Sequence, residues 1–237
     1  MSKRAVILAG GKGTRLRPYT VVLPKPLVPV GEFPILEIIV RQLARAGFDR
    51  ITMAVNHQAE LIKAFFGDGS KWSMSIDYSL EDKPLGTMGP LKLIPDLPAD
   101  FLVMNGDVLT DLNYGAFFDY HIDRKGVFTI SSMRREHQID YGVLEVDGSA
   151  KLLAFREKPV LDYEVSMGVY AVSRRVLERI PGGRAYGFDH LMHDMIKRGE
   201  AVNVRRHEGM WLDIGRPEDY ANALDLFESS RQAILGE

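Results

Sequence analysis

Cysteine is absent from all 237 residues of this sequence. Its absence excludes disulfide bonds, thiolate zinc sites and a cysteine nucleophile, and it is in keeping with a reducing compartment. Any metal ion would have to be bound by oxygen or by histidine. Among the six histidines, His190 and His193 stand three apart on an expected helix but have no evident third ligand, so we assign them no chemistry.

The sequence also lacks a large net charge and long apolar runs. Its formal charge is −2, so no global positive field is present to attract nucleic acid or an anionic membrane surface. The apolar run at residues 5–9 is too short for a signal peptide, and no segment approaches the length of a transmembrane helix. We therefore expect a cytoplasmic protein that binds neither nucleic acid nor membranes, and any phosphate recognition must be local.

Hydrophobic periodicity predicts strands that alternate with helices over the first half of the chain. Residues 4–9 are aliphatic and end at two glycines, which is typical of a strand buried on both faces of a parallel sheet. A helix is expected between Pro34 and Gly47. The other expected elements are strands at 51–55, 73–80 and 101–104, and helices at 59–66, 89–93 and 114–124. This alternation predicts an α/β fold with three α/β/α layers and a mainly parallel central sheet.

From residue 127 onward the pattern becomes rich in strands. Segments 142–146 and 152–156 flank the turn signal Asp147-Gly148, which predicts an inserted antiparallel ribbon. An amphipathic helix is expected at 217–235. The chain is 46% hydrophobic, long enough for one substantial core, and no repeat or linker divides it. We expect a single domain of residues 1–237.

A glycine-rich loop follows the first expected strand, where residues 8–18 read LAGGKGTRLRP. Glycines allow backbone N–H groups to approach phosphate oxygens closely. The loop is not a Walker A motif, because Gly13 stands where Ser or Thr is required. It is not a dinucleotide fingerprint either, because Leu16 replaces the third glycine. Taken alone, a tight turn with solvated cations is an equally good interpretation.

A second cationic element places one lysine between two prolines. It reads Leu23-Pro24-Lys25-Pro26-Leu27. Prolines stiffen the backbone on both sides, so the position of this lysine is fixed more tightly than that of an ordinary surface lysine. This restriction indicates a specific task for Lys25.

Seven short motifs occur in the order that characterises the sugar-1-phosphate nucleotidyltransferases, also called NDP-sugar pyrophosphorylases. They are residues 8–18, Pro24-Lys25-Pro26-Leu27, Glu81 with Pro84-Leu85-Gly86-Thr87, Asn105-Gly106-Asp107, Tyr141-Gly142, Glu157-Lys158-Pro159 and Trp211-Leu212-Asp213-Ile214-Gly215. Each motif is weakly specific, but the ordered set is highly specific and extends over nearly the whole chain. The sequence therefore resembles this family, and in motif it is most similar to the mannose-1-phosphate and heptose-1-phosphate guanylyltransferases.

The resemblance implies a Rossmann-like nucleotidyltransferase fold in three parts. These are a nucleotide-binding core at about residues 1–135, a sugar-binding lobe at about 136–210 that includes the antiparallel ribbon, and a C-terminal segment with a metal ligand at 211–237. It further implies an enzyme with an NTP and a sugar 1-phosphate as its substrates. Such an enzyme transfers a nucleoside monophosphate to the sugar phosphate, releases pyrophosphate and uses Mg²⁺ as its cofactor.

The resemblance also implies roles for individual residues. Arg15, Lys25 and Asp107 would be catalytic, and Asp107 and Asp213 would bind Mg²⁺, which prefers one or two carboxylates together with water and phosphate oxygens. The implied nucleotide-binding residues are Leu8, Ala9, Gly10, Gly11, Gly13, Thr14, Arg15, Lys25, Glu81, Gly86 and Thr87. The implied sugar-phosphate-binding residues are Asn105, Gly142, Glu157, Lys158, Ser166 and Asp213.

The chemistry of such a reaction explains why no catalytic triad is expected. The attacking phosphate is already ionised at neutral pH, so catalysis reduces to positioning and charge stabilisation. The two anionic substrates repel each other by roughly 4 kcal/mol for each pair of unit charges at about 4 Å, with an effective dielectric constant of about 20. Cationic side chains and a metal ion are therefore needed more than a general base.

Two positions bear on the choice of substrates. Glu81 falls where relatives that use uracil or thymine often carry glutamine, and a carboxylate offers only acceptors, which suits the two adjacent donors of guanine. This favours GTP, with CTP or UTP and a different sugar phosphate left open. Ser166 stands where related enzymes commonly carry asparagine, and a serine cannot reproduce the donor and acceptor of an amide. This indicates an unusual sugar, with mannose, heptose and hexosamine types left open.

Two other classes of protein remain open from the sequence. A metal-dependent glycosyltransferase also pairs a nucleotide-binding sheet with a strand-end aspartate, but it has no need of a triphosphate loop with Arg15 and Lys25. A non-catalytic regulatory subunit that binds nucleotide sugars would keep the fold without turnover. The sequence also leaves open whether the chain forms a homo-oligomer.

Overall fold

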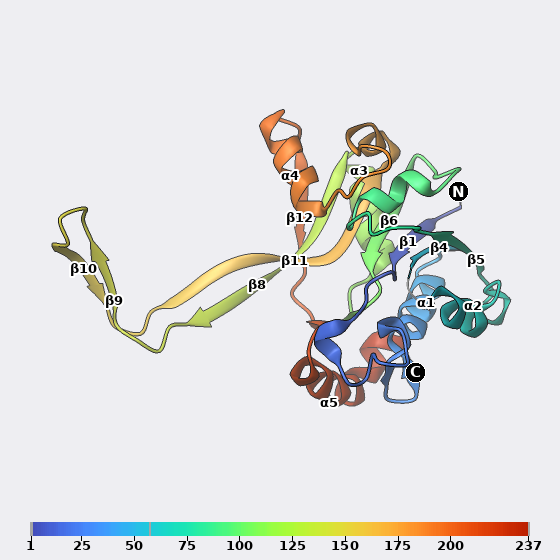
Figure 1. The fold of residues 1–237 in the computed structure, drawn as a ribbon, viewed down its shortest axis with the longest axis horizontal. Coiled ribbons are helices and arrows are strands. Elements are labelled where there is room, and N and C mark those ends of the chain that lie inside the picture. Colours follow the sequence, from blue (N-terminus) through green and yellow to red (C-terminus); the bar gives the residue numbers. More distant parts are fainter. Residues whose placement is uncertain (1, 57, 237) are drawn as a thin grey trace.

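The computed structural model describes residues 2–56 and 58–236, built around a seven-stranded central sheet (Figure 1). The strands of this sheet are β1 (Arg4–Leu8), β4 (Arg50–Val55), β5 (Ser75–Leu80), β6 (Asp100–Asn105), β8 (Phe128–Gln138), β11 (Val160–Ser173) and β12 (Val202–Arg206). Their order is β12-β8-β11-β6-β1-β4-β5. Every neighbouring pair is parallel except the two pairs that involve β11. The expected mainly parallel sheet is confirmed.

The described residues also form five α-helices and five short 3₁₀ helices, and all of these except α5 lie between strands in the sequence. The α-helices are α1 (Ile35–Arg45), α2 (Ala59–Phe66), α3 (Tyr114–Asp123), α4 (Phe188–Lys197) and α5 (Pro217–Leu235). The 3₁₀ helices are η1 (Thr14–Leu16), η2 (Lys25–Leu27), η3 (Ser70–Trp72), η4 (Gly89–Leu93) and η5 (Arg174–Arg179). None of the helices in the described part of the chain combines the length and apolar character needed to cross a bilayer.

Strand β1 shows why the molecule has three layers. Successive side chains of a strand point to opposite faces of the sheet, and in β1 both faces are covered. Ala5 and Ile7 belong to one hydrophobic core, which also contains buried residues of α1 and α5, whereas Val6 belongs to a second core that includes Met195 of α4. All three β1 side chains are fully buried. The expected three-layer α/β/α arrangement is confirmed.

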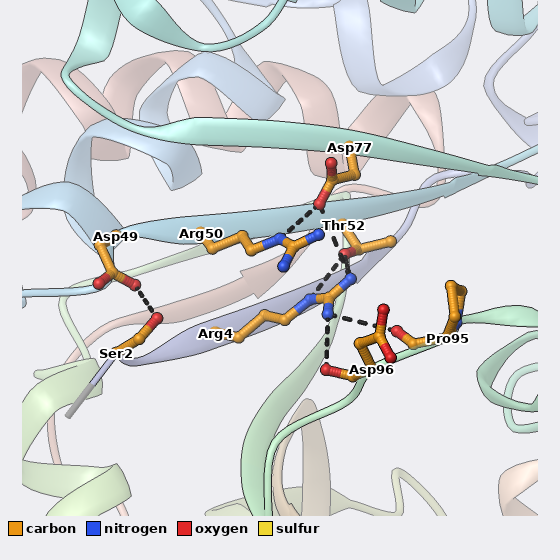
Figure 2. A network of polar contacts seen from close by, with 8 residues as sticks. All are labelled: Ser2, Arg4, Asp49, Arg50, Thr52, Asp77, Pro95 and Asp96. Atoms are coloured by element: carbon orange, nitrogen blue, oxygen red, sulfur yellow. Dashed lines mark hydrogen bonds and ion pairs between the residues drawn. The ribbon is translucent and has the colours of Figure 1, made fainter.

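A polar network fixes the start of β1, at the end of the sheet where the parallel strands β1 and β4 begin (Figure 2). Arg4 is only 4% exposed, and its guanidinium donates to Thr52 Oγ1 at 2.6 and 2.9 Å and to the carbonyl of Asp96 at 3.1 Å. Arg50 donates to Asp77 Oδ2 at 2.6 Å. These contacts tie β1, β4 and β5 together at the end of the sheet opposite the glycine-rich loop.

The other ends of β1 and β6 place two predicted motifs next to each other. The two strands are parallel and their last residues, Leu8 and Asn105, are register partners. The loop after each strand therefore leaves from the same edge of the sheet, and the Gly106 amide donates to the Leu8 carbonyl at 3.1 Å. This edge is where α/β proteins bind their ligands.

The expected antiparallel ribbon is confirmed and projects away from the body along the longest axis of the molecule (Figure 1). Strands β8 and β11 pair from Ser132 with Ser166 out to Gln138 with Val160. Beyond them, β9 (Val143–Val146) and β10 (Leu152–Arg156) form a separate two-stranded hairpin. Because β11 and β12 themselves join the central sheet, the division at about residues 136–210 remains a prediction.

Four short strands and β12 were not predicted. The short strands are β2 (Pro29–Val30), β3 (Phe33–Pro34), β7 (Val108–Thr110) and β13 (Trp211–Asp213). Two or three residues are too few to show a periodicity of two. In addition, β7 and β13 pair with each other although about a hundred residues of chain separate them. Strand β12 is an edge strand rich in polar residues, so it shows no buried pattern either.

Candidate functional site

The glycine-rich loop folds back against the lysine that was expected to act with it. Gly13 has a φ of 60°, and a Cβ at this position would lie 3.0 Å from Lys25 Cβ and from Thr20 Cγ2. Thr20 Oγ1 donates to the Gly13 carbonyl at 2.7 Å. Glycine is thus required here both by backbone conformation and by space. The close approach brings η1 and η2 together.

Lys25 is aimed at the carboxylate that follows β6. Its neighbours Pro24 and Pro26 shape the short helix η2. The Lys25 ammonium forms an ion pair with Asp107 Oδ2, and the two side chains are 11% and 20% exposed. This ion pair links the lysine element to the carboxyl edge of the parallel strands.

A second carboxylate reaches the same place through the pairing of β7 with β13. Asp213 is the register partner of Val108, and the Ile214 amide donates to the Asp107 carbonyl at 3.1 Å. Surrounding protein and then the negative charge of Asp107 raise the pKa of Asp213, whereas Lys25 and Arg15 oppose this rise. Two adjacent carboxylates of this kind repel each other unless a cation lies between or beside them.

One oxygen of Asp107 has no protein partner. Asp107 Oδ1 is buried and makes no hydrogen bond within the described part of the chain. A buried carboxylate oxygen normally has a partner, so an orphan beside a second carboxylate is the donor set that a hard divalent cation fits. No group of three or more His, Asp or Glu side chains suitable for a metal occurs among the described residues. Mg²⁺, which needs only one or two carboxylates from the protein, is compatible with this pair.

A cavity of about 280 Å³ opens beside Asp213 and is rich in positive charge. It is lined by Arg15, Arg135, Trp211, Leu212, Asp213, Gly215, Arg216 and Asp219. The guanidinium of Arg15 lies 3.6 Å from where a Cβ of Gly215 would be. Helix α5 also begins here, and Asp219 Oδ2 accepts hydrogen bonds from the Gly215 and Arg216 amides at 3.2 and 2.8 Å, so the arginines of the cavity are the groups that would bind an anion. This cavity suits a phosphate group.

A second cavity of about 480 Å³ lies under the glycine-rich loop. It is lined by Leu8, Gly10, Gly11, Lys12, Asn56, Glu81, Pro84, Gly86, Thr87, Asn105 and Asp107. It contains six of the eleven residues expected to bind the nucleotide; Arg15 lines the smaller cavity instead. Ala9, Gly13, Thr14 and Lys25 line neither cavity. Asp107 lines this cavity and Asp213 the smaller one, so the carboxylate pair stands between them.

Glu81 is a buried carboxylate at the wall of the larger cavity. It is 8% exposed, and its Oε2 accepts a hydrogen bond from the Leu85 amide at 3.1 Å. Burial raises the pKa of Glu81, and the hydrogen bond from Leu85 partly opposes this effect. Its Oε1 lies 3.1 Å from where a Cβ of Gly10 would be, so a side chain at residue 10 would press closely on this carboxylate.

The segment after Glu81 is held against the start of α4. Gly86 has a φ of 77°, and a Cβ there would lie 2.9 Å from the Tyr186 carbonyl oxygen. Thr87 Oγ1 accepts a hydrogen bond from the Phe188 amide at 2.7 Å. Gly86 is therefore required for close backbone packing, and Thr87 anchors the cavity wall.

Asn105 packs against the turn that contains Ser166. Gly168 has a φ of 74°, and a Cβ there would lie 2.6 Å from Asn105 Nδ2. Ser166 Oγ donates to the Tyr170 hydroxyl at 3.2 Å and accepts from the Gly168 amide at 3.3 Å. Ser166 therefore stabilises the irregular turn in β11 beside Asn105, and it is not among the residues that line either cavity.

Three of the residues expected to bind the sugar lie elsewhere. Gly142, Glu157 and Lys158 belong to the hairpin end of the ribbon, which Figure 1 shows far from β1 and α5. Gly142 and Glu157 do lie together, since a Cβ on Gly142 would be 3.3 Å from Glu157 Oε2. None of the three lines either cavity. The chain thus separates them from Arg15, Lys25, Asp107 and Asp213.

Four cavity residues lie outside the recognised motifs and were not assigned from the sequence: Asn56, Arg135, Arg216 and Asp219. Lys12 lies within the first motif but was given no role, and Arg216 directly follows the last motif, which was a usable signal. Arg135 had none, because its place depends on the register of β8; it stacks 5.0 Å from the Trp211 ring. The exposed His190 contacts its neighbour Asp189 at 3.1 Å and lines neither cavity.

Cationic side chains, a pair of carboxylates and a glycine-rich loop lie together at the carboxyl ends of the parallel strands. This arrangement defines a class of α/β proteins that bind phosphorylated ligands. Within this class, the chain belongs to the nucleotidyl transferase family, whose profile matches residues 4–230. This match confirms the family expected from the seven motifs.

Curated relatives carry related names. A UTP–glucose-1-phosphate uridylyltransferase from Synechocystis is 34% identical over 93% of this chain and 62% of its own length. A mannose-1-phosphate guanyltransferase from Yarrowia lipolytica is 34% identical over 96% of this chain and 64% of its own. The chain thus spans less than two thirds of the length of these relatives.

Solved structures share the fold. HddC from Yersinia pseudotuberculosis, in a complex with GMP-PN, is 27% identical with a TM-score of 0.73 over 95% of this chain and 99% of that one. A putative glucose-1-phosphate thymidylyltransferase from Bacillus anthracis is 23% identical with a TM-score of 0.77 over 95% of both chains. The second likeness concerns the fold alone.

Proposed function

We propose that the protein is a sugar-1-phosphate nucleotidyltransferase. An oxygen of the sugar phosphate attacks the α-phosphorus of an NTP, the bond from that phosphorus to the bridging β-phosphate oxygen breaks, and pyrophosphate leaves. The observation that carries the proposal is the convergence of Lys25, Asp107 and Asp213 between two adjacent cavities. Family membership and the names of the relatives support the same reaction class.

Positive charge at the meeting point of the cavities offsets the repulsion between the substrates. In this proposal Lys25 and Arg15 hold the triphosphate and stabilise the charge that develops as pyrophosphate departs. Loss of one preorganised charge stabiliser typically raises a barrier by about 3–4 kcal/mol. Arg15→Ala is therefore expected to reduce kcat by about a hundredfold or more.

Asp107 and Asp213 would hold Mg²⁺ in this site. The orphan Oδ1 of Asp107 and the crowded carboxyl of Asp213 fit the ion. When bound, Mg²⁺ supplies charge neutralisation and orientation to the phosphates. Lys25 alone neutralises only one of the two carboxylates. We therefore propose that Lys25, Asp107, Asp213 and the ion bind the phosphates together.

The nucleobase is proposed to be guanine, with Glu81 as its acceptor. The carboxylate lies in the wall of the larger cavity and offers only acceptors, which suits the N1–H and N2–H₂ donors of guanine. Several relatives are named as guanylyltransferases and one as a uridylyltransferase, so UTP is the alternative.

A matrix of NTPs against sugar 1-phosphates, in the presence of Mg²⁺ and read out as pyrophosphate formation, tests the proposal. GTP with a mannose- or heptose-type phosphate is expected to give the fastest turnover. Faster use of UTP or CTP with every sugar would reject the guanine assignment but keep the reaction class. Release of no pyrophosphate from any pair, together with turnover of a finished NDP-sugar, would instead indicate a glycosyltransferase.

A further inference from the structure

Three arginines line the smaller cavity, and none of them has an acidic partner there. Arg15 belongs to η1, Arg135 to β8 near the base of the ribbon, and Arg216 directly precedes α5. Within the described part of the chain, none of the three forms an ion pair. Guanidinium groups that converge in this way repel one another, so an anion among them stabilises the arrangement.

The two acidic residues of this cavity do not cancel the positive charge. Asp219 Oδ2 already accepts hydrogen bonds from the Gly215 and Arg216 amides. In the proposed function, Asp213 faces the metal ion together with Asp107. The guanidinium groups therefore keep free N–H donors, and the cavity has the character of an anion site.

Trp211 fixes the position of Arg135. The Arg135 guanidinium lies 5.0 Å from the centre of the Trp211 ring and donates to the Trp211 carbonyl at 3.4 Å. The Trp211 indole donates in turn to the Met167 carbonyl at 2.9 Å. Trp211 and Asp213 are two residues apart on β13, so their side chains leave the strand on the same side. Arg135 is thus held beside the strand that carries the second carboxylate of the site.

The neighbouring Arg134 shows the opposite arrangement. Successive side chains of a strand point to opposite faces, and Arg134 forms an ion pair with Asp162 of β11 at 2.9 Å. It lines neither cavity. The charge of Arg134 is therefore neutralised on the ribbon itself, whereas the charge of Arg135 is directed to the site.

The sizes and positions of the two cavities indicate which anion the arginines bind. The larger cavity, of about 480 Å³, falls in the usual range of about 300–1,000 Å³ for small-molecule sites, and the smaller one, of about 280 Å³, lies below it. A nucleoside therefore suits the larger cavity and a compact anion the smaller. Asp107 lines the larger cavity and Asp213 the smaller, so an α-phosphate held by this pair has its β- and γ-phosphates next to Arg15.

We propose that the smaller cavity receives the β- and γ-phosphates of the NTP, and that Arg135 and Arg216 join Arg15 in binding pyrophosphate as it leaves. When the sugar phosphate attacks the α-phosphorus, the electron pair of the broken bond stays on the bridging oxygen, so negative charge grows on the pyrophosphate. Guanidinium groups stabilise this charge, because their paired N–H donors match phosphate oxygens. The inference rests on the proposed function and adds two binding residues for one of its products.

Kinetics of the reverse reaction test these two arginines. In this direction pyrophosphate attacks the NDP-sugar that the substrate matrix identifies, and NTP and sugar 1-phosphate form. Arg135→Ala and Arg216→Ala are each expected to raise KM for pyrophosphate by about tenfold or more, the usual loss for a hydrogen bond to a charged group. KM for the NDP-sugar is expected to change by less than about twofold, because the sugar and the base lie outside the smaller cavity.

Two further variants serve as controls. Arg134→Ala removes an arginine from the adjacent position of the same strand and should keep the wild-type KM for pyrophosphate. Arg135→Lys keeps the charge but loses the planar fork, so it should recover only part of the affinity that Arg135→Ala loses. The side chains of Arg134, Arg135 and Arg216 are all exposed, so the variants should fold, as circular dichroism would verify.

The outcomes separate this inference from the proposed function. If the wild type makes NTP from pyrophosphate but Arg135→Ala has the same KM for pyrophosphate as Arg134→Ala, the inference is overturned and the reaction class stands. A higher KM for the sugar 1-phosphate alone would also overturn it and assign the cavity to that substrate. A wild type that neither releases nor consumes pyrophosphate is a failure of the proposed function. Titration calorimetry with pyrophosphate and Mg²⁺ then decides, and equal binding by wild type and Arg135→Ala would overturn the inference.

Discussion

At the scale of single residues, the site is defined by charges that protein groups satisfy only in part. Lys25 neutralises one oxygen of Asp107, the other oxygen is buried without a hydrogen-bond partner among the residues that the structure describes, and Asp213 adds a second carboxylate. An arrangement of this kind lowers the stability of the folded protein by itself, because buried charges without partners are unfavourable. In the proposed function a cation and phosphates would complete this arrangement, which would link the stability of the site to the substrates.

Glu81 gives a prediction about base choice and pH at the same scale. Burial raises its pKa above the ordinary value of 4.5, so on acidification it loses its charge earlier than an exposed glutamate would. Since only the ionised form is a pure acceptor, we expect KM for GTP to rise as the pH falls toward this raised pKa. Initial rates between about pH 5 and about pH 8 measure the effect.

Glu81→Gln should remove this pH dependence and shift preference from GTP toward UTP, because an amide pairs one donor with one acceptor. Glu60→Gln is the control, since Glu60 lies on α2 with an 85% exposed side chain and lines neither cavity. If both variants kept the wild-type profile and the preference for GTP, Glu81 would not contact the base.

At the scale of elements, glycines set how closely the loops around the site approach one another. Gly13 lets η1 lie against η2, Gly86 lets the segment after Glu81 pass Tyr186, and Gly168 lets β11 turn beside Asn105. Each has a positive φ and a neighbour within 3.0 Å of the missing Cβ. The loops are therefore packed elements of the structure, and their sequences are restricted by sterics as well as by ligand binding.

Gly13→Ala tests this restriction. The added Cβ would be strained at a φ of 60° and would press on Lys25 and Thr20, so we expect a loss of about 1 kcal/mol or more in unfolding free energy. Gly11→Ala is the control, because nothing lies within 4 Å of its missing Cβ and its φ is not positive. Urea denaturation compares the two; equal stabilities would show that the loop is free to move away.

How far the sequence predicts these elements depends on whether the signal is local. Helix α2 and helix α5 were predicted with their observed ends, because apolar spacing marks both and Pro217 marks the start of α5. Strand β13 was not predicted, although its motif was noted, since three residues show no period and its partner β7 is distant in sequence. Arg135 was missed for the same reason, because its position depends on the register of β8, which no local pattern encodes.

At the scale of the whole molecule, the chain combines a body built on the central sheet with a projecting ribbon (Figure 1). The body contains two hydrophobic cores on opposite faces of the sheet, whereas the hairpin exposes its apolar side chains. The motifs implied a sugar-binding lobe at about residues 136–210; they could not indicate that its hairpin, β9 and β10, projects away from the body (Figure 1). Direction in space is set by the ladder of β8 and β11, which is a property of the assembled sheet.

The stability of the body is expected to depend on one buried histidine. His121 on α3 is fully buried; its Nδ1 lies 2.7 Å from Thr129 Oγ1 and its Nε2 lies 3.3 Å from Asp100 Oδ1. Burial lowers the pKa of His121, and the charge of Asp100 opposes this only in part. The unfolded chain therefore takes up a proton near the ordinary value of 6.5, while the folded chain does not until a lower pH.

The sign of this linkage fixes the prediction. Because the unfolded state binds more protons below about pH 6.5, the unfolding free energy should fall there by at most about 1.4 kcal/mol per pH unit from this residue. His121→Gln, which can still bond Thr129, should be less stable at neutral pH but should show a flatter dependence on acidification. Urea denaturation at a series of pH values measures the slopes, and equal slopes for wild type and His121→Gln would contradict the assignment.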